Sequence, residues 1–254
     1  MKLPAMFALA SLVAFASSSN RPNLLTIQEE TSWHGWLPSG QVVEVNNIHG
    51  NVSAEPASGD EIEVVAIKRG LSDPGQVLID VVEHKGGVTI CAVYPDVDPG
   101  HPFDCRPSRG GGFREATTSD AATHIRWENG GGGDVKLNDL QVDFVVRLPR
   151  RLRFIGRTMD GDVSAHMLEQ DVEAHSVRGD VNVDLSARLG AEVHAESTKG
   201  QVSSDFPLSM RCNASHGMLA FGRVGRSHRT LRLSTEAGDI HLERPSPYDI
   251  IREL

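Results

Sequence analysis

The 254-residue sequence is poor in tryptophan and tyrosine, with three and two residues of each. Sugar-binding grooves usually present aromatic side chains, so this scarcity argues against such a groove. Positive charge is scarce too: 25 Lys and Arg against 34 Asp and Glu give a net charge of −9, which disfavours nucleic acid as a partner. Helical periodicity is rare, and after residue 16 no stretch is apolar enough for a transmembrane helix.

The N-terminus has the features of a secretory signal. Lys2 precedes an apolar run from Leu3 to Ala16 that ends in the small-residue pattern of a signal peptidase site. An ordinary buried strand or helix is the alternative. We therefore expect a signal peptide at residues 1–16, an N-terminal leader or cap containing Trp33 and Trp36 at 17–40, and one domain at 41–254, located in the periplasm or outside the cell.

One short pattern centred on a glycine recurs through the chain. The last five copies are 18, 21, 17 and 21 residues apart, and the turn glycines are Gly50, Gly161, Gly179, Gly200, Gly217 and Gly238. Around each glycine apolar and polar residues alternate with period two, which is typical of half-buried strands. Each copy therefore predicts a strand, a turn and a second strand, and self-similarity at this period indicates a solenoid.

These patterns predict an all-β fold: a single flattened β-solenoid with about two strands per coil of 17–21 residues. Each coil is expected to hydrogen-bond to the next at roughly 4.8 Å. The residue three before the glycine is Thr158, Ser176, Ser197 or Thr235, and we expect these inward hydroxyls to bond to one another along the coil axis. The Gly217 copy interrupts this ladder, because Cys212 and Ala214 occupy the inward positions before it.

The segment RTMDGDVSAHMLEQDVEAHSVRGDVNVDL, residues 157–185, carries a family resemblance. Its Thr/Ser-x-x-Gly-Asp-Val units resemble those of the bacterial putative-adhesin family of β-strand-repeat domains of unknown function. The resemblance extends over roughly residues 42–243 and is weak between 74 and 133. It implies a β-solenoid in the cell envelope and supplies no catalytic or binding residues.

Upstream of the main repeats, the sequence predicts further strands and one long loop. Residues 77–83 and 88–93 flank His84-Lys85-Gly86-Gly87 as a hairpin, and a strand is expected at 141–148. Residues 95–120 are rich in proline, aspartate and glycine and are expected to form a loop excursion.

The three cysteines suggest one disulfide. Cys91 and Cys105 have 13 residues between them and would close a loop in an oxidising compartment, worth roughly 3 kcal/mol in the chain-entropy model. Cys212 is left over, and its inward repeat position predicts a buried, reduced side chain. A nucleophile formed by Cys212 and His216 is the alternative, but the sequence suggests no third group to orient it.

No cofactor or metal site is predicted. His166, His175, His194 and His241 occupy different positions relative to their glycines, so they form no clean column for zinc. Asp162, Asp180 and Asp239 do form a column after the glycine. Turn capping by these carboxylates is the favoured interpretation, and Ca²⁺ binding is the alternative.

We expect a non-enzymatic envelope structural or adhesion-type module that binds an unknown envelope protein or glycan. The alternative is a carbohydrate-active enzyme, a polysaccharide lyase or hydrolase, on the same scaffold. Because inward positions are occupied by packing, the candidate interaction face consists of outward residues, namely Glu173, His175, Asn182, His194 and Glu196.

Overall fold

The computed structural model describes residues 27–94, 140–185, 190–212, 217–226 and 229–245. In these ranges the regular structure consists of strands and one 3₁₀ turn, η1 (Pro74–Gln76), and no helix is long and apolar enough to cross a membrane. The strands are β1 (Ile27–Gly35), β2 (Val42–Asn46), β3 (Val52–Pro56), β4 (Ile62–Gly70), β5 (Leu78–His84), β6 (Gly87–Val93), β7 (Gln141–Leu148), β8 (Arg153–Asp160), β9 (Val163–His166), β10 (Val172–Arg178), β11 (Val181–Asp184), β12 (Ala191–Ser197), β13 (Val202–Ser204), β14 (Ser209–Cys212), β15 (Met218–Val224), β16 (Thr230–Ala237) and β17 (Ile240–Glu243).

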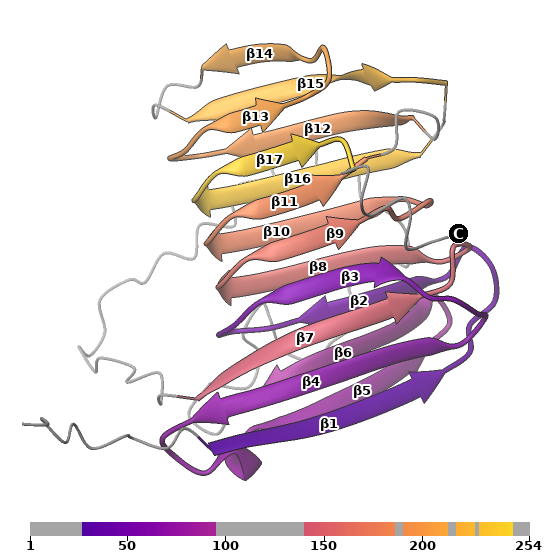
Figure 1. The fold of residues 1–254 in the computed structure, drawn as a ribbon, viewed down its shortest axis with the longest axis vertical. Helices are drawn as coiled ribbons and strands as arrows, with labels where there is room; N and C mark the ends of the chain where they lie inside the picture. The colour runs from indigo at the N-terminus through magenta and orange to yellow at the C-terminus, as the bar shows by residue number, and fades with distance from the viewer. Residues whose placement is uncertain (1–26, 95–139, 186–189, 213–216, 227–228, 246–254) are drawn as a thin grey trace, which may run out of the picture.

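The strands form two open sheets that enclose one apolar core (Figure 1). The eight-stranded sheet has the order β1-β4-β7-β3-β9-β11-β17-β13, and the nine-stranded sheet has the order β14-β15-β12-β16-β10-β8-β2-β6-β5. The predicted all-β class is therefore confirmed. The predicted hairpin forms β5 and β6, which pair antiparallel, and the predicted strand at 141–148 is β7.

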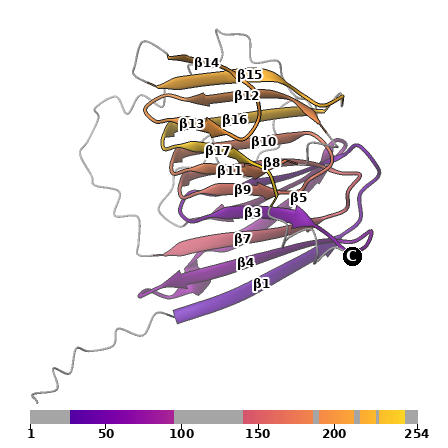
Figure 2. The same ribbon diagram turned by 45° about the horizontal axis from the view of Figure 1, so that its top comes forward.

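Five of the glycine copies have the predicted local structure. In each, a strand of the nine-stranded sheet leads through the glycine turn into a strand of the eight-stranded sheet, and we call such a pair a glycine unit. The five glycine units are β2–β3, β8–β9, β10–β11, β12–β13 and β16–β17. Alternation holds within them: Val172, Ala174 and Ser176 of β10 are buried, whereas Glu173 and His175 face outward. Figure 2 shows the units stacked one above another.

A column of glycines explains why this residue recurs. A Cβ on Gly161 would lie 2.2 Å from the carbonyl oxygen of Gly50, and one on Gly179 would lie 2.0 Å from that of Gly161. The same relation links Gly238 to Gly179 at 2.0 Å, and Gly200 to Gly238 at 1.9 Å. Each glycine is therefore required because the carbonyl of the neighbouring unit occupies the space of a side chain.

The inward hydroxyls donate to the carbonyls of this glycine column. The prediction that they bond to one another is therefore wrong. Thr158 Oγ1 donates to the carbonyl of Gly50 at 2.9 Å, and Ser176 Oγ donates to that of Gly161 at 2.8 Å. Thr235 and Ser197 donate in the same way to Gly179 and Gly238. Each hydroxyl thus satisfies a carbonyl of the adjacent unit, which matters because an unpaired buried polar group is costly.

The stacking order departs from the sequence order. We expected each coil to pair with the next, but β11 pairs with β17, and β13 pairs with the other edge of β17. The unit β16–β17 therefore lies between two units that precede it in the sequence. The predicted uninterrupted single solenoid is therefore not confirmed. Every glycine unit offers parallel strands with the same pattern of hydrogen bonds, so a unit can pair with any other unit and not only with the next one in sequence.

The Gly217 copy is not a sixth glycine unit, which corrects the prediction. β14 and β15 pair antiparallel with each other, and β15 pairs antiparallel with β12, so all three lie in the nine-stranded sheet. Cys212 is an exposed free cysteine on the edge strand β14, not a buried inward residue. The chain reverses here, so the inward positions assigned from the parallel units no longer apply.

The opposite end of the molecule contains β1, which lies in the segment expected to be a leader or cap. β1 is the edge strand of the eight-stranded sheet and pairs antiparallel with β4. Trp33 packs against the core, whereas Trp36 is 65% exposed, so only the first of these tryptophans contributes to packing.

Candidate functional site

The predicted interaction residues lie on two opposite surfaces. Glu173 and His175 on β10, and His194 and Glu196 on β12, belong to the outer face of the nine-stranded sheet. Asn182 on β11 belongs to the outer face of the eight-stranded sheet. The five residues therefore cannot form one contact surface, and the two faces must be considered separately.

The outer face of the nine-stranded sheet contains a partly buried ionic network. The Arg157 guanidinium pairs with the carboxylates of Glu44 and Glu173. Burial by itself would lower the pKa of Arg157, but the two carboxylates outweigh it and raise the pKa above its ordinary value. Because Glu44 is only 2% exposed, this arginine is the partner that permits a buried carboxylate on β2.

His175 lies beside this network and is held neutral. Its Nδ1 is 2.8 Å from Ser234 Oγ on the neighbouring strand β16. Burial, with help from the positive charge of Arg157, lowers the pKa of His175 to about 4. The imidazole is therefore uncharged at neutral pH and acts as a hydrogen-bonding group within the sheet.

Much of this outer face is closed to a partner. Glu44 and Asn46 on β2, and Thr89 on β6, are 0–2% exposed although they point away from the core between the sheets. By contrast, His194 and Glu196 on β12 are exposed. The accessible part of this sheet therefore leaves out β2 and β6: the outward residues of β12 and β14 are exposed, and those of β10 and β16 are partly exposed.

The outer face of the eight-stranded sheet carries small polar residues in register. These residues form a line across five adjacent strands, and we call it the polar row. Its members are Ser53, Ser164, Asn182, His241 and Ser203. All five are at least partly exposed, and Ser203 is the most exposed of them. Adjacent sheet strands are about 4.8 Å apart, so the row is a regular, flat array.

A row of charged residues follows the polar row on the same face. This charged row consists of Glu63, Arg147, Glu55, His166, Asp184 and Glu243. Arg147 bonds to Glu55 and Glu63, both at 2.7 Å, and its hydrogen bond lowers the pKa of Glu63. His166 Nδ1 lies 2.7 Å from Asp184 Oδ2.

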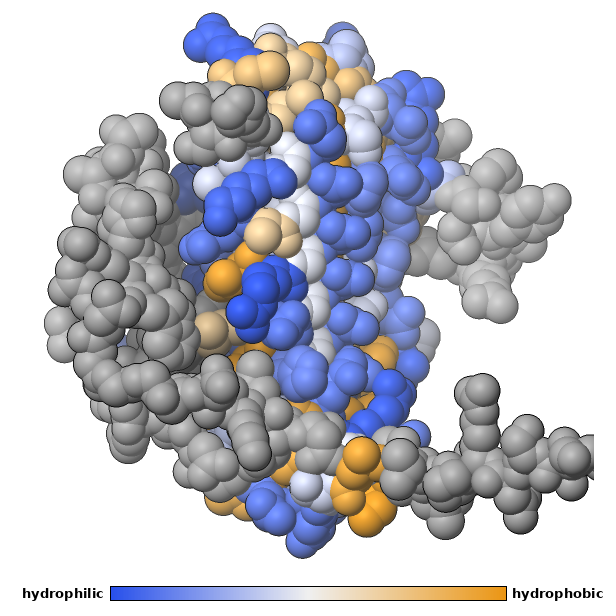
Figure 3. Space-filling view, turned by 90° about the vertical axis from the view of Figure 1, so that its left-hand side faces the viewer, coloured by the Kyte–Doolittle hydropathy of each residue, from blue (hydrophilic) through white to orange (hydrophobic). Residues whose placement is uncertain are grey.

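The glycine edge of the face carries a third row, which we call the Asx ladder. Asp162 Oδ1 accepts the backbone N–H of Asp180 at 2.8 Å, and Asp180 Oδ1 accepts that of Asp239 at 2.7 Å. The ladder continues at both ends through Asp143, Asn51 and Gln201. This edge is on the left in Figure 1 and faces the viewer in Figure 3, where hydrophilic side chains flank a pale stripe along the molecule.

The Asx ladder bears on the two interpretations of the aspartate column. One oxygen of each carboxylate caps the turn of the adjacent unit, which is the structural role we favoured, although the N–H comes from the neighbouring unit and not from the same turn. In the part of the chain that the structure describes, no three His, Cys, Asp or Glu side chains are grouped so that they could hold a metal ion.

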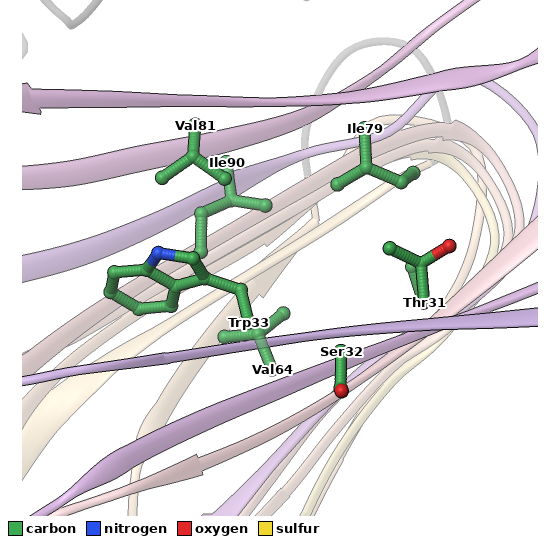
Figure 4. Close-up of a pocket in the computed structure, with 8 residues that line it drawn as sticks. Thr31, Ser32, Trp33, Val64, Ile79, Val81 and Ile90 are labelled. Carbon is green, nitrogen blue, oxygen red and sulfur yellow. The ribbon is translucent and has the colours of Figure 1, made fainter.

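A small cavity lies between the sheets at the end formed by β1 and β5. It has a volume of about 180 Å³ and is lined mainly by apolar side chains, including Trp33, Val64, Ile79, Val81 and Ile90 (Figure 4). Thr31 and Ser32 are its polar lining residues. The lining contains no ionisable side chain, so the cavity suits a small apolar group and offers no acid or base.

Only one cysteine of the expected disulfide lies in the described part of the chain. Cys91 on β6 is fully buried, while Cys105 and the alternative partner of Cys212, His216, lie outside the described residues. The pairing of Cys91 with Cys105 stays a prediction.

Sequence reasoning missed the residues that organise both faces. Arg157 and Glu44 are 113 positions apart, and the polar row combines five strands that are not consecutive in sequence. The polar row could have been identified in the sequence from the position three residues after each turn glycine. That position holds Ser53, Ser164, Asn182, Ser203 and His241.

Comparison with known proteins finds a family match over part of the chain. The Toastrack DUF4097 family matches residues 129–243, and no curated protein matches the chain. A putative cell adhesion protein from Clostridium sporogenes ATCC 15579 is similar in structure, with 10% identity and a TM-score of 0.49 over 86% of this chain and 100% of that chain. A putative adhesin from Bacteroides fragilis NCTC 9343 has 9% identity and a TM-score of 0.22 over 84% and 97% of the two chains. The match over residues 129–243 confirms the predicted resemblance to a β-strand-repeat family of unknown function.

Proposed function

We propose that the protein is a non-enzymatic, adhesion-type interaction module of the cell envelope, and that it binds its partner with the outer face of the eight-stranded sheet. The observation that carries this proposal is the polar row, in register on five strands and bordered by the charged row and the Asx ladder. A flat array of hydrogen-bonding groups on a rigid sheet is suited to an extended partner surface.

The accessibility of the two sheets favours this face. On the nine-stranded sheet, the outer residues of β2 and β6 are buried, so a partner would meet only part of the sheet. On the eight-stranded sheet, the polar row stays partly exposed from β3 to β13.

The charge of the face defines the chemistry of the partner. The charged row and the Asx ladder together hold eight carboxylates, namely Glu55, Glu63, Asp143, Asp162, Asp180, Asp184, Asp239 and Glu243. Arg69 and Arg147 are the arginines paired with them, to Asp143 and to the two glutamates respectively. The excess of negative charge favours a positively charged envelope protein or glycan, and such attraction weakens as salt rises.

The proposed location is periplasmic or extracellular. It is supported by the charged, apolar and small-residue pattern of a secretory signal at residues 1–16. Those residues lie outside the described part of the chain.

A matched pair of variants tests the face. Asn182→Arg adds one positive charge to the polar row, and His194→Arg adds a side chain of the same charge to the exposed outer face of β12. Binding would be measured to immobilised poly-L-lysine, chitosan and dextran, which are a cationic polypeptide, a cationic glycan and a neutral glycan.

We expect binding to the two cationic probes, a loss of about tenfold for Asn182→Arg, and little change for His194→Arg. Raising the salt from about 0.1 to 1 M shortens the Debye length from roughly 10 to 3 Å and should abolish binding. Equal losses for both variants, or preference for dextran, would contradict the assignment of the face.

The enzyme alternative has its own test. The protein would be incubated with a panel of polysaccharides, and released products would be measured. Turnover that disappears in a single outward variant such as Asp184→Asn would show that the protein is an enzyme and would overturn the proposal.

A further inference from the structure

The unit β16–β17 occupies an unusual place in the stack. It lies between β10–β11 and β12–β13, which are neighbours in sequence but not in space. Without it, the parallel edges of β10, β11, β12 and β13 would lose their pairing partners. The place that it occupies, which we call the gap, therefore accepts one glycine unit, paired on both sides.

The side of this gap formed by β10 and β11 makes three contacts with the inserted unit. The carbonyl of Gly179 accepts the hydroxyl of Thr235 at 2.9 Å, and the same oxygen would lie 2.0 Å from a Cβ on Gly238. Asp180 Oδ1 accepts the backbone N–H of Asp239 at 2.7 Å. These contacts require a hydroxyl residue and, three positions later, a glycine.

The side of the gap formed by β12 and β13 adds a requirement at position 239. Ser197 Oγ donates to the carbonyl of Gly238 at 2.8 Å, and Asp239 Oδ1 accepts the backbone N–H of Gln201 at 2.8 Å. Ile240 then enters the core, where it is fully buried. The gap thus selects the pattern Thr/Ser-x-x-Gly-Asp-Val/Ile, with the aspartate as a hydrogen-bond acceptor.

Arg229 holds the entrance of the inserted unit. Its buried guanidinium donates through Nε to the carbonyl of Gly190 at 2.6 Å and through Nη1 to the carbonyl of Leu168. The next residue, Thr230, donates its backbone N–H to Asp171 Oδ1 at 2.8 Å. Side-chain and backbone bonds therefore fasten β16 to the segments before β10 and before β12.

We infer that this gap is a strand-acceptor site that takes the unit β16–β17 from a second copy of the chain as well as from its own, so that copies associate by exchanging this unit. The chemistry of the gap cannot distinguish the two sources, because residues 229–240 make all of these contacts and are identical in both copies. Exchange requires a rearrangement between β15 and β16, where the structure describes Gly225, Arg226 and Arg229. This inference does not depend on the proposed binding face.

Engineered cysteines in full-length protein report the exchange. Asn182 on β11 and His241 on β17 are register partners on the outer face. Asn182→Cys and His241→Cys would be made in separate chains, each with Cys212→Ser, then mixed, incubated below the melting temperature and oxidised. We expect a disulfide between chains at these two positions, identified by peptide mapping, which increases with protein concentration.

Two controls define the register and the geometry. Glu243→Cys replaces His241→Cys in one mixture and should cross-link poorly with Asn182→Cys, because Glu243 pairs with Asp184. A single chain carrying both Asn182→Cys and His241→Cys should form the link internally.

Arg229 provides the second measurement. Arg229→Met removes two charge-assisted hydrogen bonds and should speed cross-linking between chains on the order of tenfold, whereas Arg226→Met, on an exposed side chain, should not. The wild-type chain would also be incubated at rising concentration and measured by native mass spectrometry. Absence of the cross-chain link, or absence of any dimer, would overturn the inference.

Discussion

The glycine column makes a quantitative prediction for Gly179→Ala. Gly179 has φ +146°, a conformation that side-chain-bearing residues rarely adopt, and a Cβ there would lie 2.0 Å from the carbonyl oxygen of Gly161. The backbone conformation costs about 1–3 kcal/mol. Displacing the Gly161 carbonyl, which accepts the hydroxyl of Ser176, costs about 1–3 kcal/mol more in overpacking. We therefore expect the free energy of unfolding to fall by about 2–6 kcal/mol.

Three other glycines separate the two contributions. Gly40 has φ +80°, and a Cβ added there would meet no atom within 4 Å, so Gly40→Ala should cost about 1–2 kcal/mol. Gly200→Ala meets the Gly238 carbonyl at 1.9 Å outside the left-handed region, so it reports the steric cost alone. Gly59 has neither constraint, and Gly59→Ala should change stability by less than about 0.5 kcal/mol.

Urea unfolding of the four variants, followed by circular dichroism, gives the free energies. The predicted order of destabilisation is Gly179→Ala first, then Gly200→Ala, Gly40→Ala and Gly59→Ala. A Gly179→Ala protein as stable as Gly59→Ala would refute the argument that neighbouring carbonyls exclude a side chain.

The other predictions concern register, protonation and covalent structure. Val181 is fully buried and Asn182 faces outward, so Val181→Asp should forfeit roughly 1.5–3 kcal/mol of burial before desolvation is counted, while Asn182→Asp stays within about 0.5 kcal/mol in matched thermal melts. The folded pKa of His175, about 4, lies below its unfolded value near 6.5, so between these values the unfolded chain binds the extra proton. The free energy of unfolding should therefore fall with falling pH by up to about 1.4 kcal/mol per unit, and urea titrations should show a shallower fall for His175→Gln. Peptide mapping without reductant should recover Cys91 linked to Cys105, and alkylation of both thiols would contradict that pairing.

Sequence reasoning named only Asn182 of the polar row as an interaction residue and did not assign it to a sheet, for a physical reason. Alternation with period two identifies Asn182 as outward, but it does not say which of two sheets the strand joins. Asn182 and Glu173 are nine residues apart with a glycine turn between them, and the turn carries the chain from one sheet to the other. Outward residues on the two sides of each turn therefore face opposite directions.

Local sequence alone determined the strand–turn–strand form of the glycine units, the β5–β6 hairpin and β7. These features depend on side-chain alternation and turn residues within about ten positions, and such information is contained in the segment itself. Sequence also identified Thr158, Ser176, Ser197 and Thr235 as inward, and each is at most 2% exposed.

Only the tertiary structure decided the order of the units and the partners of their polar groups. Every glycine unit offers the same pattern of backbone hydrogen bonds, so local pattern does not encode that β17 lies between β11 and β13. The antiparallel return through β14 and β15 likewise reversed the expected environment of Cys212, because burial depends on which strand lies alongside and not on the spacing from a glycine.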